Sequence, residues 1–250
     1  MTAAAPRNAA VAVVGAGDHI GAAIAERFAL EGYRVFGGRR HGDQLAPLRA
    51  KIEGVGGRFE ARGLDARIED QIAAFIREAD ADQPLKAVIF NVGANVNFPI
   101  LDTTDRVFRK VWEMACAAGF LTGREAARRM LARGAGSIFF TGATASTRGG
   151  VGYAAFASAK AGLRAVAQSM ARELGPRNIH VAHLIIDAGV DTAFVRERMT
   201  AARGAEAVAT LAPDTLMNPA SIAETYWRLH QQTRDAWTFE LDLRPYGETW

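Results

Sequence analysis

The residues best suited to acid–base chemistry stand within one short stretch, from Tyr153 to Lys160. Tyr153 carries a phenol that can give or take a proton, whereas Phe156, four residues before Lys160, has no proton to transfer. At about 100° per residue, the steps from Tyr153 to Lys160 return to nearly the same helix face. If the stretch is helical, the phenol and the ammonium group therefore face the same cleft.

A glycine-rich turn near the N-terminus is the second candidate site, with the sequence Val-Gly-Ala-Gly-Asp-His-Ile-Gly at residues 14–21. Gly15 permits a tight turn, Gly17 lets the backbone approach a pyrophosphate, and Gly21 permits close helix packing. The amides at the start of the next helix, at His19 and Ile20, face the negative charge. His19 either touches a phosphate or is a surface residue. The turn predicts a dinucleotide-binding site.

Two arginines indicate which dinucleotide is bound. Arg39 and Arg40 follow the second predicted strand, where enzymes that prefer NAD(H) commonly present an acidic residue to the ribose 2′-hydroxyl. Guanidinium groups suit a 2′-phosphate instead, through charge-assisted bidentate hydrogen bonds. NADP(H) is therefore favoured over NAD(H), and the alternative is a solvated basic turn.

The elements that must position these residues alternate along the chain. Short apolar runs predict strands at 10–14, 34–36, 58–61, 87–91, 137–141, 180–186 and 237–243. Longer periodic runs predict helices at 20–30, 43–52, 67–79, 104–132, 153–173 and 191–203. Such alternation predicts a Rossmann-type α/β fold, a doubly wound parallel sheet flanked by helices, in one domain over 1–250. The looser segment at about 187–216 is a candidate substrate lid, or a plain pair of surface helices.

Composition excludes several classes of function. The 30 basic and 27 acidic residues leave a net charge of only +3, which gives nucleic acid little support as a partner. No long apolar run or signal peptide is present, so we expect a cytoplasmic protein without a membrane partner. The single cysteine, Cys116, is best explained as a small buried hydrophobic residue, and the five histidines lack metal-binding spacing. We expect no metal and a small-molecule substrate.

Taken together, the motifs resemble those of the short-chain dehydrogenase/reductase family. They comprise the turn at Gly15, Asn91-Val92-Gly93, and the run from Thr141-Gly142-Ala143-Thr144 to Lys160. The resemblance implies that Lys160 holds the nicotinamide ribose and Asp65 lies against the adenine ring. It further implies that Asn91 steadies the sheet, that Gly93 passes close to the ribose, and that Val190 and Thr192 fold over the nicotinamide amide.

The catalytic positions depart from the family pattern. Phe156 stands where usual members have the catalytic tyrosine, Ala143 replaces the serine, and Cys116 replaces the asparagine, so that only Lys160 remains. Asp187-Ala188 replaces the usual proline-glycine after the sixth strand, which places Asp187 near the nicotinamide. Asp187 is a candidate partner for an iminium ion or a proton donor to an amine, and alternatively caps the next helix.

These departures favour a reductase that does not act on simple ketones. The spacing of Tyr153 and Lys160 is similar to that in divergent enoyl-thioester reductases of this superfamily, whose proton donor is displaced. A protonated imine needs no acid during hydride delivery. We therefore expect an NADPH-dependent reductase of a C=N or activated C=C bond, with Phe156 shaping the pocket and Tyr153 or Asp187 supplying a proton. The alternatives are a ketone or alcohol oxidoreductase using Tyr153, and a non-catalytic NADP-binding module. Tyr153 is alternatively a pocket wall or an aromatic residue at the helix start.

Association with further copies of the chain is the last expectation. The long helices at 104–132 and 153–173 are similar to those that form four-helix interfaces in the family, which implies a homotetramer or homodimer. Small residues on these helices would allow close approach: Ala126, Ala127, Ala161, Ala165 and Ala167.

Overall fold

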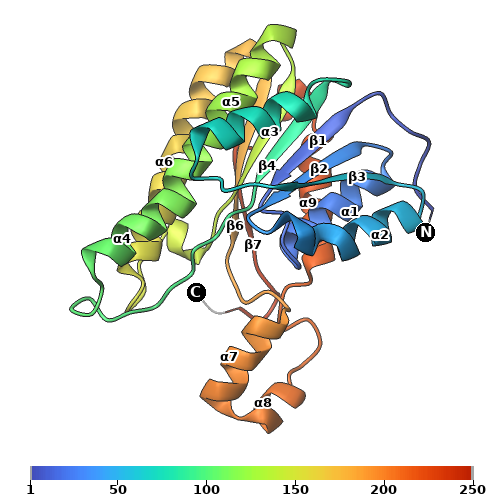
Figure 1. The fold of residues 1–250 in the computed structure, drawn as a ribbon. Helices are drawn as coiled ribbons and strands as arrows, with labels where there is room; N and C mark the ends of the chain where they lie inside the picture. The colour runs from blue at the N-terminus through green and yellow to red at the C-terminus, as the bar shows by residue number, and fades with distance from the viewer. Residues whose placement is uncertain (1, 249–250) are drawn as a thin grey trace.

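The computed structural model describes residues 2–248 as a parallel sheet covered by helices on both faces (Figure 1). The strand order is β3-β2-β1-β4-β5-β6-β7, and every neighbouring pair is parallel. The chain adds β2 and β3 on one side of β1 and then returns to add β4 on its other side. This change in strand order places a crevice at the carboxyl ends of β1 and β4. The strands are β1 (Ala10–Val14), β2 (Arg34–Arg39), β3 (Arg58–Gly63), β4 (Leu85–Phe90), β5 (Gly136–Thr141), β6 (Ile179–Ile186) and β7 (Glu240–Leu243).

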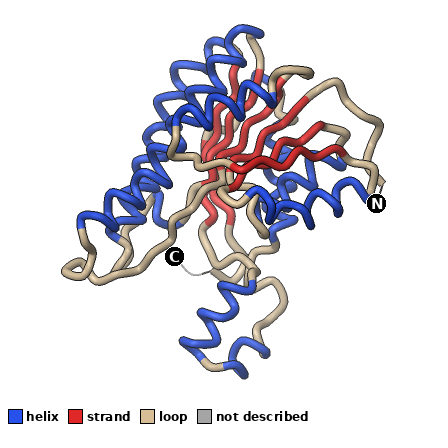
Figure 2. The backbone as a smooth tube through the Cα atoms, in the orientation of Figure 1, coloured by secondary structure: helices blue, strands red, loops and turns tan. Residues whose placement is uncertain are grey.

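Two helical layers bury the two faces of the sheet, as Figures 1 and 2 show. One face is covered by α1 (Ile20–Leu30), α2 (Ala46–Gly54) and α9 (Pro219–His230). The other is covered by α3 (Glu69–Ala79), α5 (Ala118–Arg133) and α6 (Ala154–Leu174), and α4 (Asp105–Trp112) continues this layer. The strands β1, β4 and β6 are buried along almost their whole length, which explains their nearly uninterrupted apolar sequences. The predicted fold class is confirmed.

Helix α9 was not expected from the sequence. It begins at Pro219, and the preceding Asn218 caps it: the Asn218 side chain accepts a hydrogen bond from the Ala220 amide at 2.8 Å. Its aromatic face packs on α1 through Trp227 and Phe28, whose ring centroids lie 5.6 Å apart. Its buried residues Ile222, Ala223, Tyr226 and Trp227 recur at the three- and four-residue spacing of one helix face.

The predicted helix at 104–132 is interrupted in the structure. A π-helical segment, Glu113–Ala117, separates α4 from α5 and contains Cys116. The predicted final strand is shorter than expected, because Arg234–Ala236 forms a 3₁₀ turn and Trp237 stacks on His180 at 4.9 Å before β7 begins.

Three alanines expected at a helix interface between copies have another role. Ala126, Ala127 and Ala167 are buried in the core between the helices and the sheet, because each faces inward from α5 or α6. Ala161 and Ala165 are exposed on α6. The expectation that all five alanines line an intermolecular contact is therefore wrong for the first three.

The segment after β6 projects from the carboxyl end of the sheet as a small separate lobe (Figure 1). It contains α7 (Ala193–Arg203) and α8 (Ala205–Ala209), joined at Gly204, whose φ is +88°. No residue of α7 is buried, and Val208 is the buried residue of α8. This lobe lies within the predicted lid at 187–216.

Candidate active site

Close backbone packing shapes the glycine turn between β1 and α1. Gly15 has φ +90°, and a Cβ there would lie 2.7 Å from the Asn91 carbonyl oxygen. A Cβ at Gly21 would collide with the Gly15 carbonyl, whereas a Cβ at Gly17 would meet nothing within 4 Å. Gly15 and Gly21 therefore hold the turn against neighbouring backbone, and Gly17 presents open backbone to the cavity.

The start of α1 offers free amides beside this turn. His19 precedes the helix without a side-chain cap, and no acidic residue lies in the first turn. Gly17, His19 and Ile20 all line the main cavity. Uncapped amides at a helix start favour a bound anion, so the turn fits a pyrophosphate.

A second cavity, of about 340 Å³, continues from the glycine turn to the end of β2. Arg39, Arg40 and Asp65 line it together with Gly93. Arg39 donates to the Asp18 carboxylate at 2.7 Å. This cavity has the position and the positive charge that a phosphorylated ribose requires.

The carboxylate of Asp65 is already engaged. Arg67 donates to it at 2.6 Å, and this hydrogen bond lowers the pKa of Asp65 to about 2. Asp65 therefore remains ionised at neutral pH and orders the loop that forms the wall of the second cavity.

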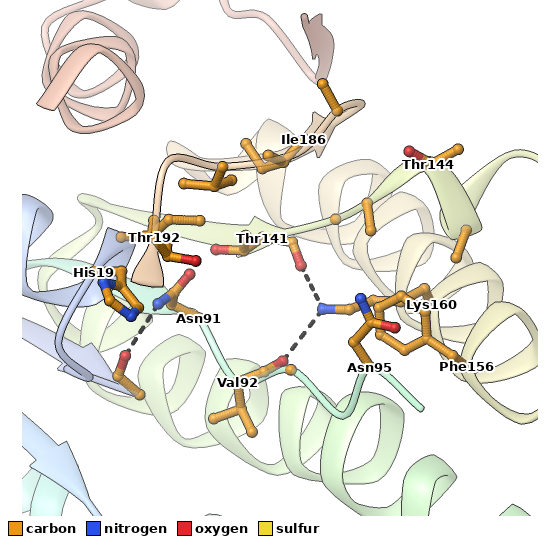
Figure 3. Close-up of a pocket in the computed structure, with 18 of the residues that line it drawn as sticks. His19, Asn91, Val92, Asn95, Thr141, Thr144, Phe156, Lys160, Ile186 and Thr192 are labelled. Carbon is orange, nitrogen blue, oxygen red and sulfur yellow. Dashed lines mark hydrogen bonds between the residues drawn. The ribbon is translucent and has the colours of Figure 1, made fainter. Parts of the chain in front are cut away.

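Asn91 joins the two loops at the crevice. Its side-chain amide donates to the Gly15 carbonyl at 3.0 Å, and its backbone amide donates to the Val14 carbonyl at 2.8 Å (Figure 3). The end of β4 is thereby fixed to the glycine turn. A Cβ at Gly93 would meet nothing within 4 Å, which leaves the chain there open to the cavity.

Lys160 lines the main cavity, and its ammonium group lies between the end of β5 and the loop after β4. It is only 3% exposed and donates to the Thr141 carbonyl at 2.8 Å and the Val92 carbonyl at 3.2 Å (Figure 3). Burial lowers the pKa of Lys160 to about 8. The side chain remains mostly protonated at neutral pH and is fixed in place by the two carbonyls.

Both aromatic residues of the Tyr153 to Lys160 stretch line the main cavity. The Phe156 ring centroid lies 5.9 Å from the Lys160 ammonium nitrogen and 6.5 Å from the Tyr153 ring centroid. Tyr153 precedes the first residue of α6, so it stands one turn before Phe156. The phenol and the lysine thus share one cavity.

The main cavity has a volume of about 630 Å³ and runs from the glycine turn to the start of α6. Val190 and Thr192 form part of its wall, and the Thr192 hydroxyl accepts from the Val195 amide at 3.1 Å to begin α7. Ala143 and Phe156 contribute an apolar wall. Cys116, expected beside them, is buried behind this wall and does not line the cavity.

Asp187 is buried next to the cavity rather than in its lining. It is 1% exposed, and its two oxygens face Arg148 at 3.0 Å and Arg244 at 3.5 Å. Arg148 lines the cavity, as does Asn95, and sequence reasoning did not identify either residue. Arg148 lies in a glycine-rich loop without periodicity, so its charge was the only available signal.

A buried hydrogen-bond chain supports the loop after β5. The Ser146 hydroxyl accepts from the Ala143 amide at 3.1 Å and lies 3.4 Å from His183 Nε2. His183 Nδ1 lies 3.1 Å from Glu240, and burial lowers the pKa of His183 to about 4. The imidazole is therefore neutral at pH 7 and acts as a structural link. The Thr141 hydroxyl is also occupied, at 2.7 Å from the Tyr226 hydroxyl.

Residues 9–203 match the family model for short chain dehydrogenases. The chain belongs to the short-chain dehydrogenase/reductase family. A short-chain dehydrogenase from Rhodopseudomonas palustris has 63% identity to it and a TM-score of 0.83, over 96% of this chain and 100% of the other. An actinorhodin polyketide ketoreductase crystallised with NADPH has 22% identity and a TM-score of 0.87, over 97% and 98% of the two chains.

Curated relatives are more distant. The 2-dehydro-3-deoxy-D-gluconate 5-dehydrogenase of Pseudoalteromonas atlantica is 25% identical over 132 residues, which is about half, 52%, of each chain. The 3-oxoacyl-acyl-carrier-protein reductase MabA of Mycobacterium bovis is 28% identical over 189 residues, 74% of this chain and 71% of the relative. The names of both relatives describe oxidoreductases.

Within residues 2–248, none of the helices is long and apolar enough to span a bilayer. The same residues contain no group of three or more histidine, cysteine, aspartate or glutamate side chains that could hold a metal ion.

Proposed function

We propose that the protein is an NADP(H)-dependent reductase that delivers hydride to a C=N bond or to an activated C=C bond. One observation carries the proposal: Phe156 faces Lys160 at 5.9 Å, where usual family members have a phenol, while Tyr153 lines the same cavity one turn earlier. The proton donor is thus displaced from the place where a ketone oxygen would need it.

The residues around the crevice fit NADP(H). Arg39 and Arg40 hold the 2′-phosphate, and the start of α1 receives the pyrophosphate. Lys160 holds the nicotinamide ribose, and the remaining cofactor contacts come from Gly15, Gly17, His19, Ile20, Gly21, Asp65, Asn91, Gly93, Val190 and Thr192. The nicotinamide supplies the hydride when it is bound. The ketoreductase of similar fold that was crystallised with NADPH supports this assignment.

Tyr153 serves as the proton donor for an activated C=C bond. Hydride addition to the β carbon of an enoyl thioester leaves negative charge on an oxygen three bonds away, and a phenol displaced by one helix turn suits that separation. Arg198 lies 3.4 Å from the Tyr153 hydroxyl, so its positive charge stabilises the phenolate that remains after proton transfer.

An iminium substrate needs less from the protein. It is already positively charged, and hydride addition produces a neutral amine without a proton transfer. Ala143 and Phe156 supply an apolar wall that excludes water and cannot stabilise a developing oxyanion. Asp187 is held by Arg148 and Arg244, so we assign it a positioning role and Tyr153 the proton transfer.

Ketone or alcohol chemistry with Tyr153 as the acid is the second candidate. The names of the relatives favour it, because they describe a 3-oxoacyl reductase, a polyketide ketoreductase and a sugar-acid dehydrogenase. In this case Tyr153 replaces the missing tyrosine directly.

The experiment follows NADPH oxidation with cyclic imines, enoyl thioesters and ketones, using wild type and Tyr153→Phe. We expect imines or enoyl thioesters to turn over and ketones to be inert. A lost general acid lowers kcat about 100-fold or more on enoyl substrates and has little effect on preformed iminium ions. Tyr246→Phe, on an exposed ring, is the matched control.

Two further variants separate the roles of the other residues. Lys160→Ala should weaken NADPH binding with every substrate, and Asp187→Asn should leave proton transfer intact. Ketone turnover that depends on Tyr153 would favour the second candidate. NADPH binding without oxidation by any substrate would instead indicate a non-catalytic module.

A further inference from the structure

A positive charge is exposed at the end of the main cavity that is remote from the glycine turn. Three of its described lining residues carry a full charge: Asp18, Arg148 and Lys160. Asp18 pairs with Arg39 at the cofactor end, and Lys160 is buried against two carbonyls. Arg148, whose side chain is 44% exposed, is therefore the charge available to a substrate.

The buried carboxylate of Asp187 fixes the position of Arg148. One terminal nitrogen of its guanidinium donates to Asp187 at 3.0 Å, and Asp187 is 1% exposed. A buried carboxylate is costly unless it is paired, so Asp187 restrains Arg148 at the cavity wall. Asp187 stands where usual family members have proline, so this anchor departs from the family pattern.

A second guanidinium reaches the same region from the lobe of α7 and α8. Arg198 on α7 donates to the Tyr153 hydroxyl at 3.4 Å, and its guanidinium carbon lies 5.7 Å from the Phe194 ring centroid. Tyr153 and Arg148 both line the cavity. The catalytic end of the cavity is therefore positively charged from two sides.

We propose that the substrate is a small carboxylic acid whose carboxylate lies beside the reducible bond and is bound by Arg148. A guanidinium recognises a carboxylate through paired charge-assisted hydrogen bonds. This inference rests on the proposed reductase function. Asp187 is a positioning residue in it and contacts no substrate.

The reaction balances with the groups named. Hydride from NADPH adds to the imine carbon, the π electrons of the C=N bond move to nitrogen, and the iminium charge is neutralised as NADP⁺ forms. For a C=C bond, hydride adds to one carbon and Tyr153 supplies the proton that the other end requires. The carboxylate is unchanged and serves to align the double bond.

The test compares acids with neutral analogues of the same shape. Δ1-piperideine-2-carboxylate is paired with 2-methyl-Δ1-piperideine, and cinnamate is paired with methyl cinnamate, each with NADPH. We expect kcat/KM to favour the acid by about 10- to 100-fold, the range for hydrogen bonds between charged groups. Arg148→Met should bring this ratio close to one, and Arg148→Lys should give an intermediate ratio.

Two further variants control for charge and folding. Arg49→Met removes an exposed arginine that also pairs with one carboxylate, Glu53 at 2.7 Å, and should preserve the ratio. Arg148→Met combined with Asp187→Asn removes both charges of this ion pair, so the test remains valid if the single variant does not fold.

Calorimetric binding of pipecolate and of piperidine to the NADP⁺ complex gives a readout independent of turnover. Pipecolate binding that disappears in Arg148→Met supports the inference even if no compound oxidises NADPH, an outcome that would refute only the proposed function. Equal kcat/KM for acids and neutral analogues would overturn the inference. It would also be overturned if neither pipecolate nor the acids distinguished wild type from Arg148→Met.

Discussion

Phe156, Ala143 and Tyr153 define how the cavity differs from that of a usual family member. The first two place no hydroxyl group at the positions where usual members have the tyrosine and the serine, while Tyr153 supplies a phenol from the residue preceding α6. A ketone oxygen beside Lys160 would therefore have no phenol to protonate it. A negative charge that develops one helix turn away could instead be protonated by Tyr153. The position of the proton donor therefore decides which class of double bond this cavity can reduce.

The first prediction at the residue scale concerns cofactor choice. Replacing Arg39 and Arg40 together by alanine should raise the Kd of NADPH about tenfold or more, because hydrogen bonds to charged groups contribute about 1.5–3 kcal/mol each. The Kd of NADH should change little. Fluorescence titration with both cofactors measures this. Tighter NADH binding by wild type, or an unchanged NADPH Kd in the variant, would refute the preference.

At the scale of elements, the carboxyl ends of β1, β4, β5 and β6 bring the cofactor residues together. The sequence predicted these strands because their apolar runs are buried on both faces. It also predicted the grouping of Gly15, Asn91 and Lys160, since parallel strands deliver their following loops to one edge. The fold, and the grouping of the candidate cofactor residues around one crevice, could therefore be predicted from the sequence.

Other features depend on contacts that a single sequence does not encode locally. The π-helical segment at Glu113–Ala117 lies within an ordinary helical pattern. Arg148 was missed because its loop has no periodicity. The partner of Asp187 could not be predicted, because an ion pair between distant loops is set by tertiary structure.

The second prediction concerns the lobe of α7 and α8, which we propose as a lid over the substrate. No residue of α7 is buried, so its amides should exchange rapidly with solvent in the free protein. Closure over NADPH and a substrate analogue should slow exchange across 193–209, while α9 should remain unchanged. Hydrogen exchange measured by mass spectrometry tests this. Equal exchange in the free and bound states would identify a plain pair of surface helices.

At the scale of the whole molecule, α4 and α5 expose several large apolar side chains. Phe108, Trp112 and Phe120 are 39%, 44% and 44% exposed. Large apolar side chains exposed on successive helices are candidates for an association surface. We propose that a second copy of the chain covers them in a homodimer or homotetramer.

The third prediction tests this association. Wild type should scatter light as a dimer or tetramer, and Trp112→Glu combined with Phe120→Glu should yield monomers, since a buried unpaired carboxylate opposes association. Phe194→Glu, which changes an exposed ring on α7, should keep the assembly of the wild type. A monomeric wild type at micromolar concentration would remove the proposed interface.

The fourth prediction is a loss of stability in mild acid. Burial lowers the pKa of His183 and of His230 from 6.5 to about 4. The unfolded chain therefore binds more protons between pH 6.5 and 4, so the free energy of unfolding falls as the pH falls through this window. The expected loss is roughly 3 kcal/mol per histidine. Urea denaturation across this range should show it, and His230→Gln should reduce the slope. A flat profile would contradict the assigned neutral state.

The central claim is that this cavity lacks an acid where a ketone oxygen would lie, and Phe156→Tyr tests it most directly. NADPH oxidation by a ketone should be slow in wild type and rise about 100-fold or more in this variant, the usual contribution of a positioned general acid. Reduction of an imine should change little. Rapid ketone reduction by wild type, with no gain from Phe156→Tyr, would contradict the account and leave Tyr153 as an ordinary carbonyl acid.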